Sequence, residues 1–458
     1  MRRIVIVGGG YAGFYTAWKL EKLLAPREAE LVIIDPRPYM TYQPFLPEVS
    51  AGSIEARHAA VSLRTHLKRT KVVAGTVTSI EHAAKTVTVR PPDAADYPLT
   101  YDVIVVTAGA VTRKLPVPGA DDVAIGMKHV EEAVAIRDRL LTAFDRAAAL
   151  PEGPERRRLL TVVFVGGGFS GVEGFSELLS LATALLRRYP ELRFSDLSFH
   201  LVEANRRILP EVTDRPGAWV VRELEQRGGR IHLGARALSL EGGHVVLSNG
   251  EEFDANLIVW TAGNGAHPVI AKHTDLPTDE RGRIVVRPDL RVGTDDDPVE
   301  DAWAAGDNAA VPDLAIPGTT TVPNAQHAVR QGKRLAANIA AVLRGEQPRA
   351  YRHASLGVVA TLGLGRGIFQ YQHLVITGFM AWVMHRGYHV LAIPTWERKF
   401  RVLLVWISAL FAGRDIVSLL SVQNPREAFV AAGVPRVAAA APAPDATPAA
   451  GEQLPRAA

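Results

Sequence analysis

The sequence predicts an α/β protein with two Rossmann-type dinucleotide-binding domains, followed by a C-terminal membrane-associating helical segment. Three observations support this prediction. Residues 3–13 read RIVIVGGGYAG, and residues 161–173 read TVVFVGGGFSGVE. Each stretch combines a β-branched run, typical of a buried parallel strand, with a Gly-x-Gly-x-x-Gly turn and a helical continuation. Near the C-terminus, residues 402–413 (VLLVWISALFAG) are strongly apolar.

The first unit begins with a strand over residues 4–7 and a helix over residues 14–24. Gly8, Gly10 and Gly13 allow a tight turn and a close approach to a pyrophosphate, at which the helix N-terminus points. A second strand over residues 31–34 ends in Asp35. An acid at this position can bind a ribose hydroxyl pair, although a turn residue before a proline is the alternative.

The next stretch predicts a loop and a small sheet. Residues 39–57 are rich in aromatic residues and proline and lack a clear period, which is typical of a long functional loop. Residues 72–77 and 86–89 are expected to form strands of a small sheet. Val77 could contact an adenine through its backbone or could simply belong to the core.

A parallel strand over residues 101–106 ends in Thr107-Ala108-Gly109. This small-residue turn lets the chain pass close to a nucleotide, unless it is only a strand-to-loop turn. Residues 130–148 have the apolar spacing of a helix. Residues 150–158 are rich in proline and arginine and predict a connector.

The second unit starts at Leu159, with Gly166, Gly168 and Gly171 in its turn. A helix is expected over residues 172–186 and a strand over residues 199–202. The acid that ends this strand, Glu203, should bind a ribose 2′-hydroxyl and repel a 2′-phosphate, which favours NADH over NADPH. The neighbouring Arg206 and Arg207 leave the choice open, because arginine can accept that phosphate.

The rest of the second unit repeats the plan of the first. Residues 231–247 suggest a β-meander, and residues 257–260 predict a returning strand. That strand ends in Thr261-Ala262-Gly263, which matches Thr107-Ala108-Gly109. The repeat therefore extends beyond the glycines.

Residues 282–292 and 303–308 have a sequence pattern like that of the first unit and are expected to belong to it. Within the second of these segments, Trp303-Ala304-Ala305-Gly306-Asp307 ends a strand with an acid that could hold a polyol hydroxyl. Residues 323–339 (PNAQHAVRQGKRLAANI) predict a helix whose N-terminus could face the electron-rich edge of a flavin ring.

The C-terminal part changes in character. Residues 351–430 carry eight Lys and Arg against three Asp and Glu. The apolar run at residues 402–413 is too short to span a bilayer and follows the basic, aromatic sequence WERKFR. This combination favours a helix in the membrane interface, with a buried core or dimerisation helix as the alternative. Residues 437–458 are rich in Ala and Pro and are expected to be disordered.

Composition narrows the chemistry. The 458 residues include no cysteine, which excludes disulfides, cysteine metal sites and redox-active thiols, and no metal is expected. The net charge of +4 gives little support to nucleic-acid binding. The first strand begins at Arg3 with no room for a signal peptide, so the nucleotide domains are expected in the cytoplasm.

Six motifs together resemble the type II NADH:quinone oxidoreductases, the single-subunit, non-proton-pumping NADH dehydrogenases. The motifs are GGGYAG, GGGFSGVE, LVEANRRILP, VWTAGN, WAAGDN and NAQHAVRQG, and the resemblance spans about residues 3–420. The stretch WERKFRVLLVWISALFAGRDIVSL looks like the membrane anchor of bacterial members.

The resemblance implies a set of cofactor-binding and catalytic residues. For FAD it implies Gly8, Gly10, Gly13, Asp35 and Asp307, and for NADH Gly166, Gly168, Gly171, Glu173 and Glu203. Further cofactor-binding candidates within these motifs are Tyr11, Ala12, Phe169, Ser170, Gly263, Gly306 and Ala325, and candidates outside them are Arg37, Val77, Ala108 and Gly109. Gln326 matches the first glutamine of the family's quinone-site helix. Arg330 stands where the family usually has another glutamine, and Gln331 follows it. Glu173 matches an acid that the family places near the nicotinamide and the quinone. The catalytic candidates are therefore Glu173, Gln326, Arg330 and Gln331.

The sequence thus predicts hydride transfer from NADH to FAD and two-electron reduction of a membrane quinone, without proton pumping. The expected domains are residues 1–112 and 271–350 for FAD, 113–270 for NADH, 351–430 as anchor and 431–458 as tail. The protein is expected on the cytoplasmic face of the cell membrane, and a homodimer through the C-terminal helices is a further expectation. The alternatives are a soluble NADH:acceptor reductase for a small redox protein and a non-enzymatic NADH sensor.

Overall fold

A computed structural model describes residues 1–354, 357–418, 426 and 429–430. Residues Met1–Ser418 form one compact unit, and Leu419–Ala458 form a second. The tail predicted over residues 437–458 lies outside the described residues, as does most of the second unit.

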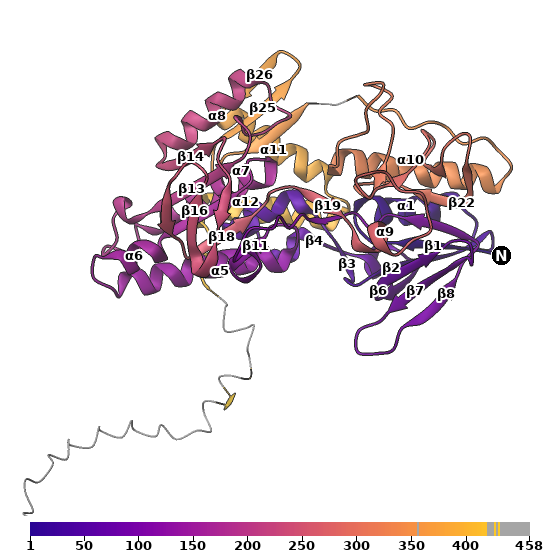
Figure 1. The fold of residues 1–458 in the computed structure, drawn as a ribbon, viewed down its shortest axis with the longest axis horizontal. Coiled ribbons are helices and arrows are strands. Elements are labelled where there is room, and N and C mark those ends of the chain that lie inside the picture. The colour runs from indigo at the N-terminus through magenta and orange to yellow at the C-terminus, as the bar shows by residue number, and fades with distance from the viewer. Residues whose placement is uncertain (355–356, 419–425, 427–428, 431–458) are drawn as a thin grey trace, which may run out of the picture. The chain divides into compact units, whose positions relative to one another are not determined.

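A six-stranded sheet organises the first nucleotide unit, with strand order β21-β22-β9-β1-β2-β5 (Figure 1). Its strands are β1 (Arg2–Val7), β2 (Ala29–Asp35), β5 (Lys71–Ala74), β9 (Val103–Val106), β22 (Pro298–Ala304) and the antiparallel edge strand β21 (Arg291–Gly293). Residues far apart in sequence therefore share one sheet, because β22 pairs in parallel with β9.

Two helices pack closely beside this sheet. Helix α1 (Tyr11–Leu23) follows the first glycine turn, and α10 (Ala325–Leu343) lies along it (Figure 1). A Cβ atom at Gly332 of α10 would come within 2.5 Å of the Ala12 carbonyl oxygen, so only glycine allows this approach. The predicted helix over residues 323–339 is confirmed, with Asn324 as its N-cap.

A five-stranded parallel sheet organises the second unit, with order β11-β18-β12-β13-β14. Its strands are β11 (Ala124–Gly126), β12 (Thr161–Val165), β13 (Ser198–Glu203), β14 (Gly229–Leu233) and β18 (Leu257–Trp260). The helices are α5 (Val130–Ala148), which is the helix that the sequence predicts, α7 (Phe169–Leu185) and α8 (Asp214–Gln226).

Three predicted boundaries were wrong. The predicted strand over residues 72–77 is divided at Gly75, where a Cβ would come within 2.8 Å of Val89. Its first part, β5, joins the large sheet. The small sheet consists of β6 (Thr76–Glu81), β7 (Thr86–Arg90) and β8 (Tyr97–Thr100). Residues 229–233 form parallel strand β14, and the meander comprises β15 (Ala237–Ser239), β16 (His244–Leu247) and β17 (Glu252–Asp254). The predicted connector contains helix α6 (Pro154–Leu159), with proline in its first turn.

Residues 39–57, predicted as a long functional loop, are mostly buried and contain short regular elements. The segment contains β3 (Tyr39–Thr41), η1 (Gln43–Phe45), α2 (Leu46–Ser50) and the start of η2 (Ala56–Ala59). Every residue of α2 is buried, and Glu48 Oε2 accepts a hydrogen bond of 2.7 Å from the Trp406 indole. The aromatic residues that suggested a loop belong to a core shared with the C-terminal segment.

The C-terminal segment was predicted as helical, but it begins with an antiparallel sheet. Strands β24 (Val358–Thr361), β25 (Gly367–Tyr371) and β26 (Leu374–Thr377) precede α11 (Phe379–Ala392) and α12 (Trp396–Ala412). These strands are short runs without a strong period, which hides them in the sequence. In the part of the chain that the structure describes, no helix combines the length and hydropathy needed to cross a bilayer.

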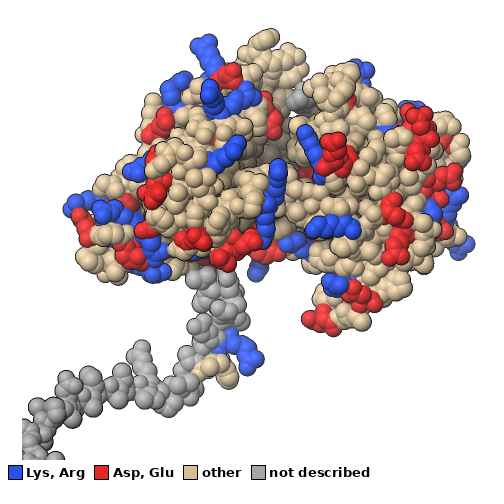
Figure 2. Space-filling view, viewed as in Figure 1, with Lys and Arg blue, Asp and Glu red and all other residues tan. Residues whose placement is uncertain are grey.

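Short elements connect these layers. A ribbon of β10 (Ala110–Thr112) and β19 (Asn264–Ala266) links the ends of the two Thr-Ala-Gly turns. The remaining elements are β4 (Ala60–Ser62), α3 (Leu63–His66), α4 (Ala120–Val123), η3 (Phe194–Asp196), η4 (Glu241–Gly243), α9 (Pro268–Lys272), β20 (Ile284–Val285) and β23 (Ala309–Ala310). Figure 2 shows acidic and basic side chains mixed over one face, with several Lys and Arg beside a hollow.

Candidate active site

The two glycine-rich turns have nearly the same geometry. Gly8 and Gly166 both adopt positive φ, of 98° and 115°. A Cβ at Gly13 would lie 1.9 Å from the Gly8 carbonyl oxygen, and a Cβ at Gly171 would lie 1.9 Å from that of Gly166. Each turn therefore needs glycine at both positions for the helix to start directly after the strand.

The acid that follows each turn is fixed by the backbone in the same way. Asp35 accepts hydrogen bonds from the Gly9 and Arg37 amides, each of 2.7 Å. Glu203 accepts them from the Gly167 amide at 2.6 Å and the Asn205 amide at 2.7 Å. Burial raises the pKa of Asp35 despite its hydrogen bonds to the two amides. Each carboxylate is thus held beside its turn, where a ribose hydroxyl pair could reach it.

One cavity of about 2010 Å³ connects both turns with the C-terminal segment. Most residues predicted from the sequence line it. These are Gly8, Gly10, Tyr11, Ala12, Asp35, Arg37, Ala108, Gly109, Gly166, Gly168, Phe169, Ser170, Gly171, Glu173, Glu203, Gly263, Gly306, Asp307, Ala325, Gln326 and Arg330.

Three predicted residues do not line this cavity. Gly13 lies beneath the first turn, where it permits the close packing described above. Val77 is buried in β6. Gln331 is 1% exposed, and both ends of its amide are hydrogen-bonded, because Oε1 accepts from the Gly306 amide at 2.8 Å and Nε2 donates to Thr321 at 3.0 Å. The geometry gives Gln331 a structural task, holding the turn before Asp307.

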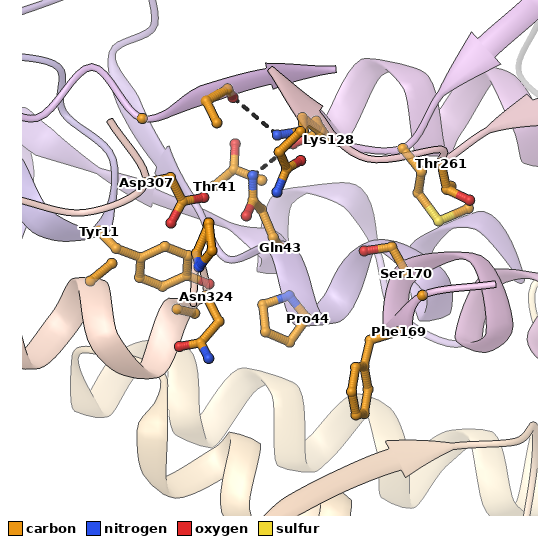
Figure 3. A pocket seen from close by; sticks show the side chains of 18 of the residues that line it. Tyr11, Thr41, Gln43, Pro44, Lys128, Phe169, Ser170, Thr261, Asp307 and Asn324 are labelled. Atoms are coloured by element: carbon orange, nitrogen blue, oxygen red, sulfur yellow. Dashed lines mark hydrogen bonds between the residues drawn. The ribbon is translucent and has the colours of Figure 1, made fainter. Parts of the chain in front are cut away.

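The residues around the first turn fit a bound flavin dinucleotide. A Cβ at Gly10 would meet no atom within 4 Å, so the backbone opens directly into the cavity. Figure 3 shows the Tyr11 ring between Asp307 and Asn324. Burial raises the pKa of the Asp307 carboxyl, and the positive charge of Lys128 opposes that rise. The N-terminus of α10 lies on the same side and can stabilise negative charge on the ring.

Lys128 and Gln43 are site residues that sequence reasoning missed. Lys128 Nζ donates to the Ala110 carbonyl at 3.0 Å, and the Lys128 carbonyl accepts from Gln43 at 3.4 Å (Figure 3). Both lie outside any glycine motif, and only the fold brings them to the cavity. Pro44, on the same segment as Gln43, lies between Tyr11 and Phe169 in the view.

Glu173 lies in the first half of α7 at the wall of the cavity. It is 7% exposed, and its Oε1 accepts a hydrogen bond from the Thr361 amide at 3.0 Å. His385 Nε2 lies 3.3 Å from the same oxygen, without hydrogen-bond geometry. Burial raises the pKa of Glu173 to about 8 and lowers the pKa of His385 to about 3, so both groups are neutral at pH 7.

The first two turns of α10 present Gln326 and Arg330 to the cavity. Arg330 Nη1 donates to the Gln326 carbonyl at 2.9 Å, and Gln326 Nε2 donates to the Gly357 carbonyl at 3.4 Å. One guanidinium N–H is thus committed to the helix, and the remaining donors of Arg330 are at the cavity wall.

Comparisons with known proteins agree with this architecture. Residues 2–332 match the pyridine nucleotide-disulphide oxidoreductase family. A type II NADH:quinone oxidoreductase of Staphylococcus epidermidis is 30% identical over 375 residues, covering 80% of this chain and 89% of its own. The corresponding Ndh protein of Mycobacterium tuberculosis is 27% identical over 418 residues, covering 88% and 87%. The structure of NDH2 from Plasmodium falciparum in complex with NADH superposes with a TM-score of 0.83 at 17% identity, covering 91% and 99%.

The family match includes both glycine-rich turns, so the chain belongs to the pyridine nucleotide-disulphide oxidoreductases. Because it has no cysteine, it lacks the redox-active thiol for which that family is named. Within this class, the chain is a member of the type II NADH:quinone oxidoreductases.

Proposed function

We propose that this protein oxidises NADH through bound FAD and passes the two electrons to a quinone that enters from a membrane, without translocating protons. The observation that carries the proposal is the single cavity, which joins two dinucleotide turns to the apolar C-terminal helices. Electron transfer between three reactants requires such a shared space, because the protein must orient them at contact distance.

The first unit is assigned to FAD and the second to NADH. When bound, FAD supplies two-electron chemistry that accepts from a nicotinamide and donates to a quinone. Gly8 and Gly10 would carry its pyrophosphate, Asp35 its adenine ribose, and Asp307 its polyol chain. These roles follow from the position of each group along the cavity wall.

The second turn favours NADH over NADPH. The Glu203 carboxylate is fixed by two amides, so it cannot move away from a 2′-phosphate. Arg207, which could have accepted that phosphate, pairs with Asp214 at 2.6 Å and also donates to the Pro210 carbonyl. Asn205 donates a further hydrogen bond of 2.7 Å to Glu203.

Quinone is assigned to the part of the cavity between α10, α7 and α11. Gln326 and Arg330 provide donors for a carbonyl oxygen, and Glu173 provides a carboxyl group that carries a proton at neutral pH. The overall reaction takes up one proton with NADH and quinone, and Glu173 is a suitable place to hold it.

We propose that α11 and α12 attach the protein peripherally to the cytoplasmic face of the cell membrane. Their exposed side chains include large apolar residues such as Phe379 (61%), Trp396 (84%), Phe400 (63%) and Phe411 (88%). Basic residues of the sequence WERKFR lie at the start of α12, next to this apolar face. The domain division given above remains a prediction, and so does a homodimer. Light scattering in detergent would test for the homodimer.

The first experiment measures anaerobic NADH oxidation by the purified, FAD-loaded protein with and without a short-chain quinone. Quinone-dependent turnover is the expected result. Flavin reduction by NADH without reoxidation by any quinone would contradict the proposal and favour the alternative, a soluble reductase for a redox protein.

A second experiment tests attachment. The triple variant Phe400→Ser, Leu404→Ser, Phe411→Ser should lose most sedimentation with anionic lipid vesicles while it keeps its turnover with a water-soluble quinone, because none of these exposed residues lines the cavity. A matched control replaces three exposed apolar residues outside the cavity and the C-terminal helices, Tyr97, Phe194 and Ile316, with serine. Equal loss in both triples would contradict a role for α12.

A further inference from the structure

A pair of buried side chains, Tyr42 and His389, lies on the cavity wall beyond the residues already assigned. Tyr42 Oη and His389 Nδ1 are 2.9 Å apart. Tyr42 is 4% exposed and His389 is 7% exposed, and they come from segments separated by more than 340 positions. The fold, rather than local sequence, brings them together.

The position of the pair relates it to the route of a membrane substrate. His389 lies in the last turn of α11, and the residues that follow it along the cavity include Leu391 (73% exposed) and Trp396 (84% exposed). At the other side, the Tyr42 ring lies 6.0 Å from that of Tyr11, the residue beside Asp307. The pair therefore stands between the apolar opening and the flavin side of the cavity.

Aromatic packing fixes the imidazole ring. The His389 ring centroid lies 5.9 Å from that of Tyr42, 6.1 Å from Phe45 and 4.4 Å from His385. Phe45 in turn packs edge-on against Trp406 of α12 at 5.7 Å. A ring held in this way presents its nitrogen atoms in a set direction, as a binding group must.

The direction of this hydrogen bond is linked to which imidazole nitrogen carries the proton. Burial lowers the pKa of His389 well below its usual value and raises the pKa of Tyr42 well above its usual value, so both groups are neutral. Among the described residues the Tyr42 hydroxyl has His389 as its sole hydrogen-bond partner. If the Tyr42 hydroxyl donates to Nδ1, the imidazole proton is on Nε2; if Nδ1 donates to the hydroxyl oxygen, Nε2 is unprotonated.

Nε2 of His389 has no hydrogen-bond partner among the described residues, while the residue itself lines the cavity. We propose that the Tyr42 hydroxyl donates to Nδ1, which places the imidazole proton on Nε2, and that this N–H donates to a carbonyl oxygen of the bound quinone; Tyr42 is then the positioning residue that fixes the tautomer. The proposal rests on the proposed function, since it assigns a binding group to the same quinone.

The kinetic test uses the full-length, FAD-loaded enzyme with a short-chain quinone and, separately, with ferricyanide, an acceptor that has no carbonyl group. His389→Leu should lower kcat/KM for the quinone about tenfold, the effect of one lost hydrogen bond. The KM for NADH and the ferricyanide rate should stay within about twofold. Tyr42→Phe should give a smaller loss, about threefold, because part of the imidazole would then carry its proton on Nδ1.

Three controls make the result specific. His389→Gln, whose amide can donate near the position of Nε2, should recover most of the loss, and His244→Leu at an exposed site of β16 should change nothing. The double variant of Tyr42 and His389 should be no worse than His389→Leu alone. An unchanged kcat/KM in His389→Leu, or an equal loss with ferricyanide, would overturn the proposal.

A spectroscopic measurement separates this inference from the proposed function. In protein labelled with ¹⁵N-histidine, the His389 signals, assigned by their loss in His389→Gln, should show an unprotonated Nδ1 and a protonated Nε2. Tyr42→Phe should shift that balance. The opposite tautomer would overturn the inference even if quinone turnover is intact. Absence of quinone turnover in the unmodified enzyme, with the expected tautomer, would instead remove the proposed function.

Discussion

The two dinucleotide units are almost superimposable in their local chemistry. In the first, the Thr107 hydroxyl lies 3.0 Å from the carbonyl oxygens of Val7 and Gly8. In the second, the Thr261 hydroxyl lies 3.0 Å from those of Val165 and Gly166. The acids at the ends of β2 and β13 are held by amides at equivalent positions in both units. The turns alone therefore do not distinguish the two nucleotides.

The difference lies in what covers the helix after each turn. Helix α1 packs against α10, and its buried Thr16 hydroxyl donates to the Ala12 carbonyl at 2.7 Å and lies 3.1 Å from that of Gly332. Helix α7 instead buries two acids, Glu173 and Glu177, under the C-terminal segment.

The buried acids of α7 meet partners that α1 lacks. Glu177 accepts from Arg414 at 2.7 Å and from the Thr361 hydroxyl at 3.0 Å. Glu173 meets the Thr361 amide and His385. The two turns are alike, and the segments packed on the helices after them differ. Helix α1 packs against α10 of its own domain, whereas α7 packs against the C-terminal segment that we assign to quinone and membrane.

The largest expected effect comes from adding one methyl group to each turn. Gly13→Ala would place Cβ 1.9 Å from the Gly8 carbonyl, and Gly171→Ala would do the same at Gly166, so strand and helix must separate. Gly13→Ala should yield protein without flavin absorbance. Gly171→Ala should keep its flavin but raise the KM for NADH at least a hundredfold.

Absorbance at 450 nm and steady-state kinetics check this pair of outcomes. Gly217→Ala in α8 is the matched control, because its Cβ would meet the nearest atom at 3.6 Å and the backbone is helical. If both turn variants lost flavin equally, the assignment of one nucleotide to each unit would fail.

The repeat was predictable from sequence because its chemistry is local. Glycines at positive φ, a β-branched run and an acid at the end of the next strand specify each unit within about 40 residues. The segments that pack on the helices after the turns were not predictable, since residues 39–57 lack a clear period, which is typical of a loop, and β24–β26 have no strong period. Pairs such as Tyr42 with His389 and Glu173 with His385 depend on long-range packing, for which no spacing in the sequence gives a signal. Gln331 was predicted from a motif as a catalytic residue, but the fold buries it beneath the site.

A smaller effect is expected in how the free energy of unfolding depends on pH, and it arises from α7 and not from α1. Residue 173 is the second after Gly171, and the equivalent residue of the first unit is Tyr15. The folded protein holds the Glu173 proton up to about pH 8, whereas an unfolded chain releases it near 4.5. The folded state therefore binds more protons between these values, and the free energy of unfolding falls as pH rises through this window.

Glu173→Gln should remove that contribution. Between pH 6 and pH 8 the unmodified protein should lose about 2 kcal/mol of stability relative to Glu173→Gln, measured by urea unfolding. Glu346→Gln at an exposed site controls for the change in charge. Flavin retention should not vary over the same range, because the first unit has no acid at this helical position. Parallel pH curves for the two proteins would contradict the buried, protonated state of Glu173.

The smallest expected effect tests whether the two turns are equivalent in energy as well as in geometry. Thr107→Val and Thr261→Val each remove one hydroxyl that bridges two backbone carbonyls. The strand carbonyls keep a second partner, the amides of Thr107 and Thr261 at 2.8 Å, so each variant should lose only about 1 kcal/mol of unfolding free energy. The serine variants, which retain the hydroxyl, serve as controls. Urea unfolding that gave costs differing by more than about 1 kcal/mol would mean that the cover of each helix, and not the turn alone, sets the strength of these bonds.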